Sequence, residues 1–297
     1  MKHGIALSVA SSALFATMYF YATLMKPFDG DIVFAWRIVM GLPMMALVVH
    51  RGRGWGALRA TAARFRRGRF LAAMGVCSAL LGVQLWLFVW APLHGYALDV
   101  SMGYFLLPLV MVLAGRLVYR ERLSVWQAWA VGFAVLGVLH EWWRLGAVSW
   151  ATLLVALGYP PYFMLRRRLQ VDALSSLWFD MLFLLPVAVL ILQAQAMDAA
   201  RIFAAHPRLL LQVPLLGLLS AVSLSMYLAA SRVLPMSLFG LLSYVEPVLL
   251  FWVAFLLMGE PVGASQWLTY GPIWLAVALV AFEGLQKWRA EARHAAG

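Results

Sequence analysis

The residues best suited to chemistry in this chain are a glutamate and a proline that stand side by side in an apolar run. Glu246 and Pro247 lie near the middle of residues 235–258. A charged side chain at the centre of a bilayer costs roughly 3 kcal/mol or more. Proline cannot donate to the helix ladder and displaces the carbonyl four residues before it, and the freed backbone groups need protein or a water-filled cavity beside them. The pair therefore predicts a polar cavity.

Two chemical roles are open to Glu246 in such a cavity. The carboxylate binds a cationic part of a solute, or it carries a coupling proton. The alternative is structural, in which Glu246 accepts a buried hydrogen bond from a neighbouring tyrosine or tryptophan and only holds helices together.

Two other charges fall inside apolar runs, Arg37 and Asp180. At a rise of 1.5 Å per residue each lies about 10 Å deep in a hydrocarbon core of about 30 Å, near opposite faces. We therefore expect no direct salt bridge between them. Each is a candidate gating or coupling charge, and local pairing with a neighbouring side chain is the alternative.

Aromatic and amide side chains complete the candidate site. We expect Glu246, Tyr244 and Tyr104 to contact a solute, with a second group of residues behind them: Gln84, Trp90 and Tyr159. Pro108 and Pro247 are expected to shape or hinge the helices around the cavity. The alternative for such polar and aromatic positions is helix–helix contact or a place at the membrane interface.

The composition indicates which kind of structure positions these side chains. The chain has 297 residues, of which 64% are hydrophobic and 12% charged, whereas soluble domains have about half and a quarter. Its long uncharged runs predict an all-α integral membrane protein. Ten spans are expected, at residues 4–25, 31–49, 70–92, 98–118, 123–141, 148–165, 173–193, 208–231, 235–258 and 262–286.

The basic residues predict an orientation. With the N-terminus inside, 18 of the 23 Lys and Arg residues fall on the inner side and four on the outer side. This positive-inside bias predicts cytoplasmic N- and C-termini in a plasma (inner) membrane. It also accounts for the net charge of +11, so no nucleic-acid partner is expected. Anionic lipids are expected at the basic cytoplasmic connections.

An internal repeat divides the chain. Aligning Pro108 with Pro247 also pairs Glu121 with Glu260, and an odd number of spans in each half makes the halves face opposite ways. Inverted repeats around a midplane site are typical of secondary transporters. We expect two five-helix halves, residues 1–145 and 146–297, around a central cavity lined by spans one, three, four, six, eight and nine.

The sequence contains none of several common nucleotide-binding and catalytic motifs. The chain contains no G-x-x-x-x-G-K-[ST] loop, no H-E-x-x-H and no G-x-S-x-G, and its six histidines are scattered. We expect no catalytic residue, no metal and no cofactor, and hence no enzyme. The alternatives to a transporter are a membrane scaffold or sensor and, less favoured, an intramembrane enzyme that acts on lipid-linked substrates.

Longer stretches resemble a known family. Residues 86–123, "WLFVWAPLHGYALDVSMGYFLLPLVMVLAGRLVYRERL", and 231–261, "SRVLPMSLFGLLSYVEPVLLFWVAFLLMGEP", are similar to the RarD-type branch of the EamA family, in the drug/metabolite transporter superfamily. The resemblance covers residues 4–286. It implies ten helices in two inverted halves and export of small metabolites or drugs from the cytoplasm.

The chain also departs from that branch. Members often carry Asn where this chain has Leu107, a small residue where it has Glu246, and Glu where it has Asp180. These changes suggest a retuned pocket. Together the residues and the resemblance predict a secondary transporter or facilitator that exports amino-acid-like or amphipathic, drug-like solutes by alternating access, with a proton as a further partner if transport is coupled.

Overall fold

The protein is a bundle of helices. The computed structural model describes residues 2–52, 54–91, 96–146, 149–257 and 264–294. Within these ranges every regular element is a helix and none is a strand. Four helices, Gly30–Arg51 (α2), Gly68–Trp90 (α4), Ala173–Ala194 (α8) and Leu209–Val233 (α10), are long and apolar enough to cross a membrane. The all-helical architecture is as predicted, and these helices are consistent with a membrane protein.

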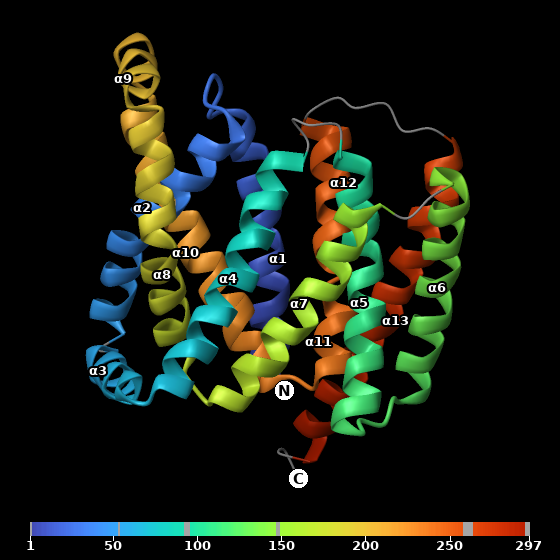
Figure 1. Cartoon of the computed structure of the whole chain (residues 1–297). Helices are drawn as coiled ribbons and strands as arrows, with labels where there is room; N and C mark the ends of the chain where they lie inside the picture. The colour runs from blue at the N-terminus through green and yellow to red at the C-terminus, as the bar shows by residue number, and fades with distance from the viewer. Residues whose placement is uncertain (1, 53, 92–95, 147–148, 258–263, 295–297) are drawn as a thin grey trace.

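The helices follow one another with short connections (Figure 1). Their bounds are α1 Lys2–Thr23, α2 Gly30–Arg51, α3 Trp55–Ala63, η1 Arg64–Arg66, α4 Gly68–Trp90, α5 Ala97–Tyr119, α6 Val125–Leu145, α7 Trp150–Leu169, α8 Ala173–Ala194, α9 Ala196–Ala205, α10 Leu209–Val233, α11 Met236–Leu242, α12 Val245–Leu257 and α13 Ala264–His294.

The helices begin and end where local chemistry allows. α6 starts with a capping box, in which the Ser124 hydroxyl accepts a hydrogen bond from the Gln127 backbone N–H. The side-chain oxygen of Gln127 in turn accepts one from the Ser124 backbone N–H. Asp172 caps α8 by accepting from the backbone N–H of Ser175 at 2.9 Å. α6 ends at Gly146, whose φ of 78° is a left-handed cap that glycine adopts without strain.

The predicted spans coincide with helices, with one correction. Within the described residues, nine of the ten expected ranges each match one long helix. The range 235–258 is instead two helices, α11 and α12, because the chain breaks at Ser243 and Tyr244. Two short helices, α3 and α9, lie in segments expected to be plain connections.

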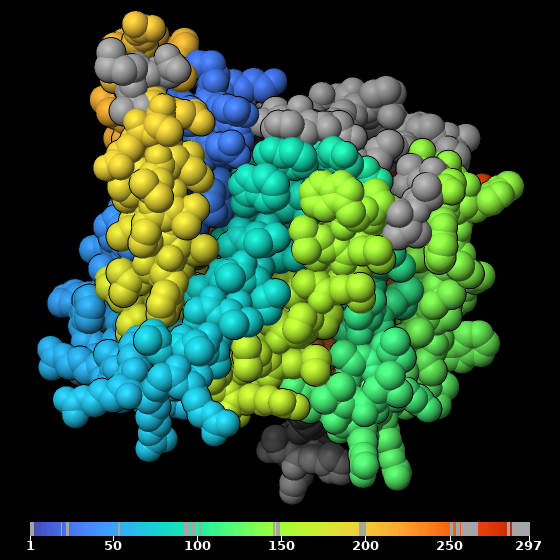
Figure 2. All heavy atoms as spheres, viewed as in Figure 1, coloured from blue at the N-terminus to red at the C-terminus, as the bar shows by residue number. Residues whose placement is uncertain are grey.

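Helices distant in sequence form the core. α1 packs against α10 and α12, α4 against α7 and α8, α2 against α8 and α10, and α5 against α7 and α11, while α6 and α13 form a pair at one edge. Both chain ends lie on one side of the bundle, which we call the terminal side, and α9 lies at the other (Figure 1). The segment around α3 and the α5–α6 connection also reach the terminal side (Figure 2).

Candidate functional site

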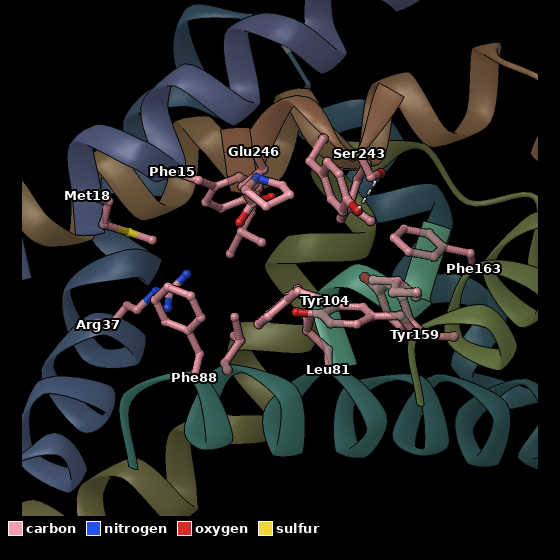
Figure 3. A pocket seen from close by; sticks show the side chains of 17 residues that line it. Phe15, Met18, Arg37, Leu81, Phe88, Tyr104, Tyr159, Phe163, Ser243 and Glu246 are labelled. Carbon is pink, nitrogen blue, oxygen red and sulfur yellow. Dashed lines mark hydrogen bonds between the residues drawn. The ribbon is translucent and has the colours of Figure 1, made fainter. Parts of the chain in front are cut away.

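A cavity lies among the helices, and Figure 3 shows the side chains that line it. The space open to the centres of water-sized molecules is about 60 Å³, and the wider hollow of about 770 Å³ includes open solvent. Its walls come from the six segments expected to line it and, in addition, from α2. The described side chains on its walls are Phe15, Met18, Arg37, Leu81, Leu85, Phe88, Tyr104, Leu107, Tyr159, Tyr162, Phe163, Leu224, Tyr227, Leu228, Ser243, Glu246 and Pro247.

Glu246 reaches this cavity because the helix breaks just before it. Pro247 has no N–H and crowds the carbonyl of Ser243, four residues earlier. The ladder is interrupted there, and the Ser243 carbonyl instead accepts from the N–H of Glu246 at 3.3 Å. Glu246 thus stands in the first turn of α12, where the positive end of the helix dipole stabilises a carboxylate. The side chain points into the cavity (Figure 3).

Arg37 of α2 faces the same cavity. Its side chain is 3% exposed, and its Nε donates to the hydroxyl of Ser220 on α10 at 2.7 Å. Figure 3 shows Arg37 and Glu246 both directed into the cavity. The two described side chains, Arg37 and Glu246, both line the cavity, and no direct ion pair joins them.

The rest of the wall is aromatic and aliphatic. Tyr104 and Tyr159 lie next to each other, with ring centroids 6.3 Å apart. Phe15 meets Tyr227 edge to face at 5.7 Å, and the Tyr227 hydroxyl is 3.3 Å from that of Ser243. Two charges of opposite sign therefore stand in a wall that otherwise favours apolar and aromatic groups.

Three of the expected contact residues lie outside the cavity wall. Tyr244 is fully buried and donates to a backbone carbonyl of α5, that of Phe105, at 2.9 Å. Gln84 donates through Nε2 to the Leu154 carbonyl at 2.7 Å. Trp90 stacks with ring centroids 5.7 Å from Tyr96. Each of these side chains is placed at a contact between helices or in an aromatic cluster, and that position favours the structural alternative.

Asp180 belongs to a separate buried centre. It is 0% exposed and forms an ion pair with Arg166 of α7. Oδ1 also accepts from the Ser78 hydroxyl at 2.7 Å, and Oδ2 from the Tyr162 hydroxyl at 3.3 Å. Because Tyr162 lines the cavity, this centre supports the cavity wall without facing it.

The burial of Arg166 was not expected from the sequence. The expected span 148–165 stops just before Arg166, yet the Arg166 side chain is 3% exposed inside the bundle. The spacing of Arg166 from two aromatic residues of the same helix indicates which way its side chain faces. Arg166 follows Tyr162 by four residues and Phe163 by three, so it lies on the helix face that carries these two cavity residues.

Pro108 and Pro247, which the repeat aligns, occupy different structural positions. Pro247 lines the cavity beside the break between α11 and α12. Pro108 lies inside α5, which continues through it from Ala97 to Tyr119. The Pro108 carbonyl lies close to Gly240 of α11, where an added Cβ would come within 3.0 Å of it. Pro108 is therefore part of the α5–α11 contact, and Glu260, the repeat partner of Glu121, falls outside the described residues.

The described residues hold no group of three or more His, Cys, Asp and Glu side chains that could bind a metal ion.

Comparisons with known proteins point in one direction. Residues 2–140 match the EamA-like transporter family. The chain is 50% identical to "Chloramphenicol-sensitive protein RarD" of Pseudomonas aeruginosa over 98% of this chain and 97% of that protein. It is 38% identical to an "Uncharacterized transporter" of Haemophilus influenzae, covering 97% and 96%, and 28% identical to "Protein RarD" of Escherichia coli, covering 97% of each.

A solved crystal structure shares the fold. It is only 16% identical in sequence, yet it aligns with a TM-score of 0.66 over 94% of this chain and 97% of its own.

Proposed function

The chain belongs to the RarD-like branch of the EamA family of transporters, and from this premise we propose that it is a secondary transporter or facilitator whose solute binds in the cavity between Arg37 and Glu246. It is a multi-pass membrane protein. The solute we propose is a small amphipathic metabolite with amino-acid-like charges, which leaves the cytoplasm by alternating access.

One observation carries this proposal: a guanidinium and a carboxylate face one cavity without touching each other. Arg37 has a hydrogen bond to Ser220, but neither charge has a direct ion-pair partner among the described residues. A buried charge without such a partner is unfavourable, and placing a charge at the bilayer centre costs roughly 3 kcal/mol or more. A zwitterion relieves both costs, because its carboxylate reaches Arg37 and its ammonium reaches Glu246. The tyrosines and phenylalanines of the wall then accept the apolar part of the solute.

Alternating access needs two halves that rock against each other, and we propose residues 1–145 and 146–297 for these halves. The packing pattern supports them. In the proposed repeat, the helices of the first half, α1, α2, α4, α5 and α6, correspond in order to α7, α8, α10, α11–α12 and α13 of the second half. Under this correspondence the α1–α10 contact has its counterpart in the α7–α4 contact. The α5–α7 contact has its counterpart in the α12–α1 contact. The contacts of α2 with α8, α5 with α11 and α6 with α13 map onto themselves.

We further propose that the protein lies in the inner membrane with its terminal side in the cytoplasm. The support is the distribution of Lys and Arg, of which 18 fall on the inner side in this orientation. The direction that we propose is export, as the family resemblance implies.

Solute counterflow in proteoliposomes tests the proposal. The panel contains amino acids with aromatic and aliphatic side chains, the matching amines and carboxylic acids, cationic amphiphiles, and chloramphenicol, to which one relative's name refers. Wild type is compared with Glu246→Gln and Arg37→Met. Glu141→Gln is the matched control, because Glu141 is a buried carboxylate that bonds Thr269 and Arg144 at the contact of α6 with α13, away from the cavity.

We expect flux of zwitterions that exceeds flux of the amines and acids, and a loss of at least tenfold in both cavity variants but not in the control. A change in pH dependence with Glu246→Gln would assign proton coupling to this carboxylate. Flux that is equal in wild type, Glu246→Gln and Arg37→Met, with all three folded, would contradict the proposed site.

A further inference from the structure

A short helix separates the cavity from the terminal side of the bundle. α11 runs for seven residues, Met236–Leu242, and is therefore about 10 Å long. One of its ends meets the break beside Ser243 on the cavity wall, and its other end faces the terminal side.

One aromatic residue of this helix packs against the wall of the cavity. Phe239 of α11 is fully buried and packs with ring centroids 5.1 Å from Phe163 and 4.8 Å from Tyr227. Phe163 and Tyr227 both line the cavity. Phe239 thus packs behind two rings of the cavity wall, on the helix that leads from Ser243 toward the terminal side (Figure 1).

The far end of α11 is held by a carboxylate from the other half of the chain. Glu121, just beyond α5, accepts the backbone N–H of Met236 at 2.7 Å and that of Ser237 at 2.8 Å, one with each oxygen. Bonds of this kind, from N–H groups to a charged acceptor, are among the stronger ones in proteins. They also lie at the positive end of the α11 dipole.

Arg167 of α7 lies beside Glu121 at the start of α11. It lies 3.7 Å from the carboxylate of Glu121, and it donates to the carbonyl of Ser231 at 2.9 Å and to that of Leu234 at 2.5 Å. These two carbonyls belong to the end of α10 and the connection into α11. Glu121 and Arg167 thus tie the terminal-side ends of α5, α7, α10 and α11 together.

The close approach of α5 to α11 depends on a glycine. A Cβ at Gly115 would lie 2.6 Å from the Glu121 carboxylate and 2.9 Å from the backbone nitrogen of Ser237. Glycine therefore leaves room for the bonds that Glu121 makes.

We propose that Glu121 is the latch of a gate on the terminal side. Its two bonds hold α11 in place, so that Phe239 closes the cavity toward the terminal side. When the latch is released, α11 pivots at the break beside Ser243 and the cavity opens to the terminal side. This inference rests on the proposed transport cycle, but its test does not require a solute.

The gate is tested by the rate at which a cavity cysteine reacts from each side of the membrane. The chain has one cysteine, Cys77. The reporter is Ser243→Cys in a Cys77→Ala background, which places a thiol of nearly the same size on the cavity wall. A membrane-impermeant thiol reagent is added to either side of vesicles, and cleavage of a C-terminal tag identifies the terminal side.

In this background we expect Glu121→Ala to raise the labelling rate from the terminal side at least tenfold, because both bonds that exist only in the closed gate are lost. Glu121→Gln keeps the side-chain size and one acceptor oxygen, so we expect a smaller increase, of about threefold. Glu141→Gln, which removes a buried carboxylate from the contact of α6 with α13, should leave the rate unchanged.

Glu121→Gln is the deciding variant if Glu121→Ala fails to fold. Equal terminal-side rates for the reporter with Glu121, with Gln and with Ala, in folded and equally inserted protein, would overturn the proposal. A lower unfolding temperature without a change in labelling would also overturn it, because that result assigns Glu121 a structural role only. Labelling and solute flux are separate measurements, so failure of the transport proposal is distinguishable from failure of the gate.

Discussion

The buried pair of Arg166 and Asp180 gives the sharpest test of how this bundle is held together. Both side chains are almost completely inaccessible, at 3% and 0% exposure. Removing one partner of a buried ion pair leaves an uncompensated charge, and this costs about 3–5 kcal/mol. Asp180→Leu would leave Arg166 without a carboxylate, although the Ser176 carbonyl, the Met74 sulfur and the Tyr162 ring remain beside it, so we expect a loss in that range.

The double variant Arg166→Met with Asp180→Leu should be far milder. Replacing both charges by apolar side chains of similar size removes the uncompensated charge. The Ser78 hydroxyl keeps a partner, because it also donates to the Met74 carbonyl at 2.9 Å. The Tyr162 hydroxyl loses its acceptor, which costs about 1–3 kcal/mol when the group stays buried. We therefore expect the double variant to be destabilised by about 1–3 kcal/mol, less than Asp180→Leu alone.

Equilibrium unfolding in mixed micelles, followed by fluorescence of the chain's 14 tryptophans, measures these differences for the wild type, both single variants and the double variant. The cycle should give a coupling free energy of several kcal/mol between the two positions. If the double variant loses as much stability as the two single variants added together, the pair is not coupled and the reasoning is wrong.

Three further predictions concern contacts between helices. Gly158→Ala should destabilise the bundle by about 1–3 kcal/mol, because its Cβ would meet the Gln84 amide closer than real Cβ contacts occur; Gln84→Ala in the same chain should restore most of the loss in a thermal melt, and no rescue would contradict this packing. Tyr244→Phe removes the hydrogen bond to the Phe105 carbonyl and should cost about 1 kcal/mol of stability, with no change in solute selectivity. A change of selectivity in the counterflow assay would instead show that Tyr244 contacts the solute. Gly240→Ala places a Cβ 3.0 Å from the α5 backbone and should lower the unfolding temperature more than Ala at the open position Gly271; equal melting temperatures would count against a close α5–α11 contact.

Much of the fold follows from the sequence alone. Apolar runs of about 20 residues predict where helices begin and end, because a buried backbone must satisfy its own hydrogen bonds within each segment. The same local logic predicts a disturbance at Glu246 and Pro247, and the break between α11 and α12 lies where Pro247 crowds the Ser243 carbonyl. These features depend on residues within one or two helical turns of each other, which the sequence displays directly.

Partners across the bundle were decided only by the tertiary structure. Asp180 pairs with Arg166, Arg37 and Glu246 line one cavity, and Glu121 holds the start of α11. Neither hydropathy nor spacing shows that these groups come together. Hydropathy fixes the depth of a residue in the membrane, but it does not fix the rotation of its helix or the identity of the neighbouring helix. Those are set by side-chain packing summed over the whole bundle, and so the sequence places the charges in the membrane while only the packed helices bring them together.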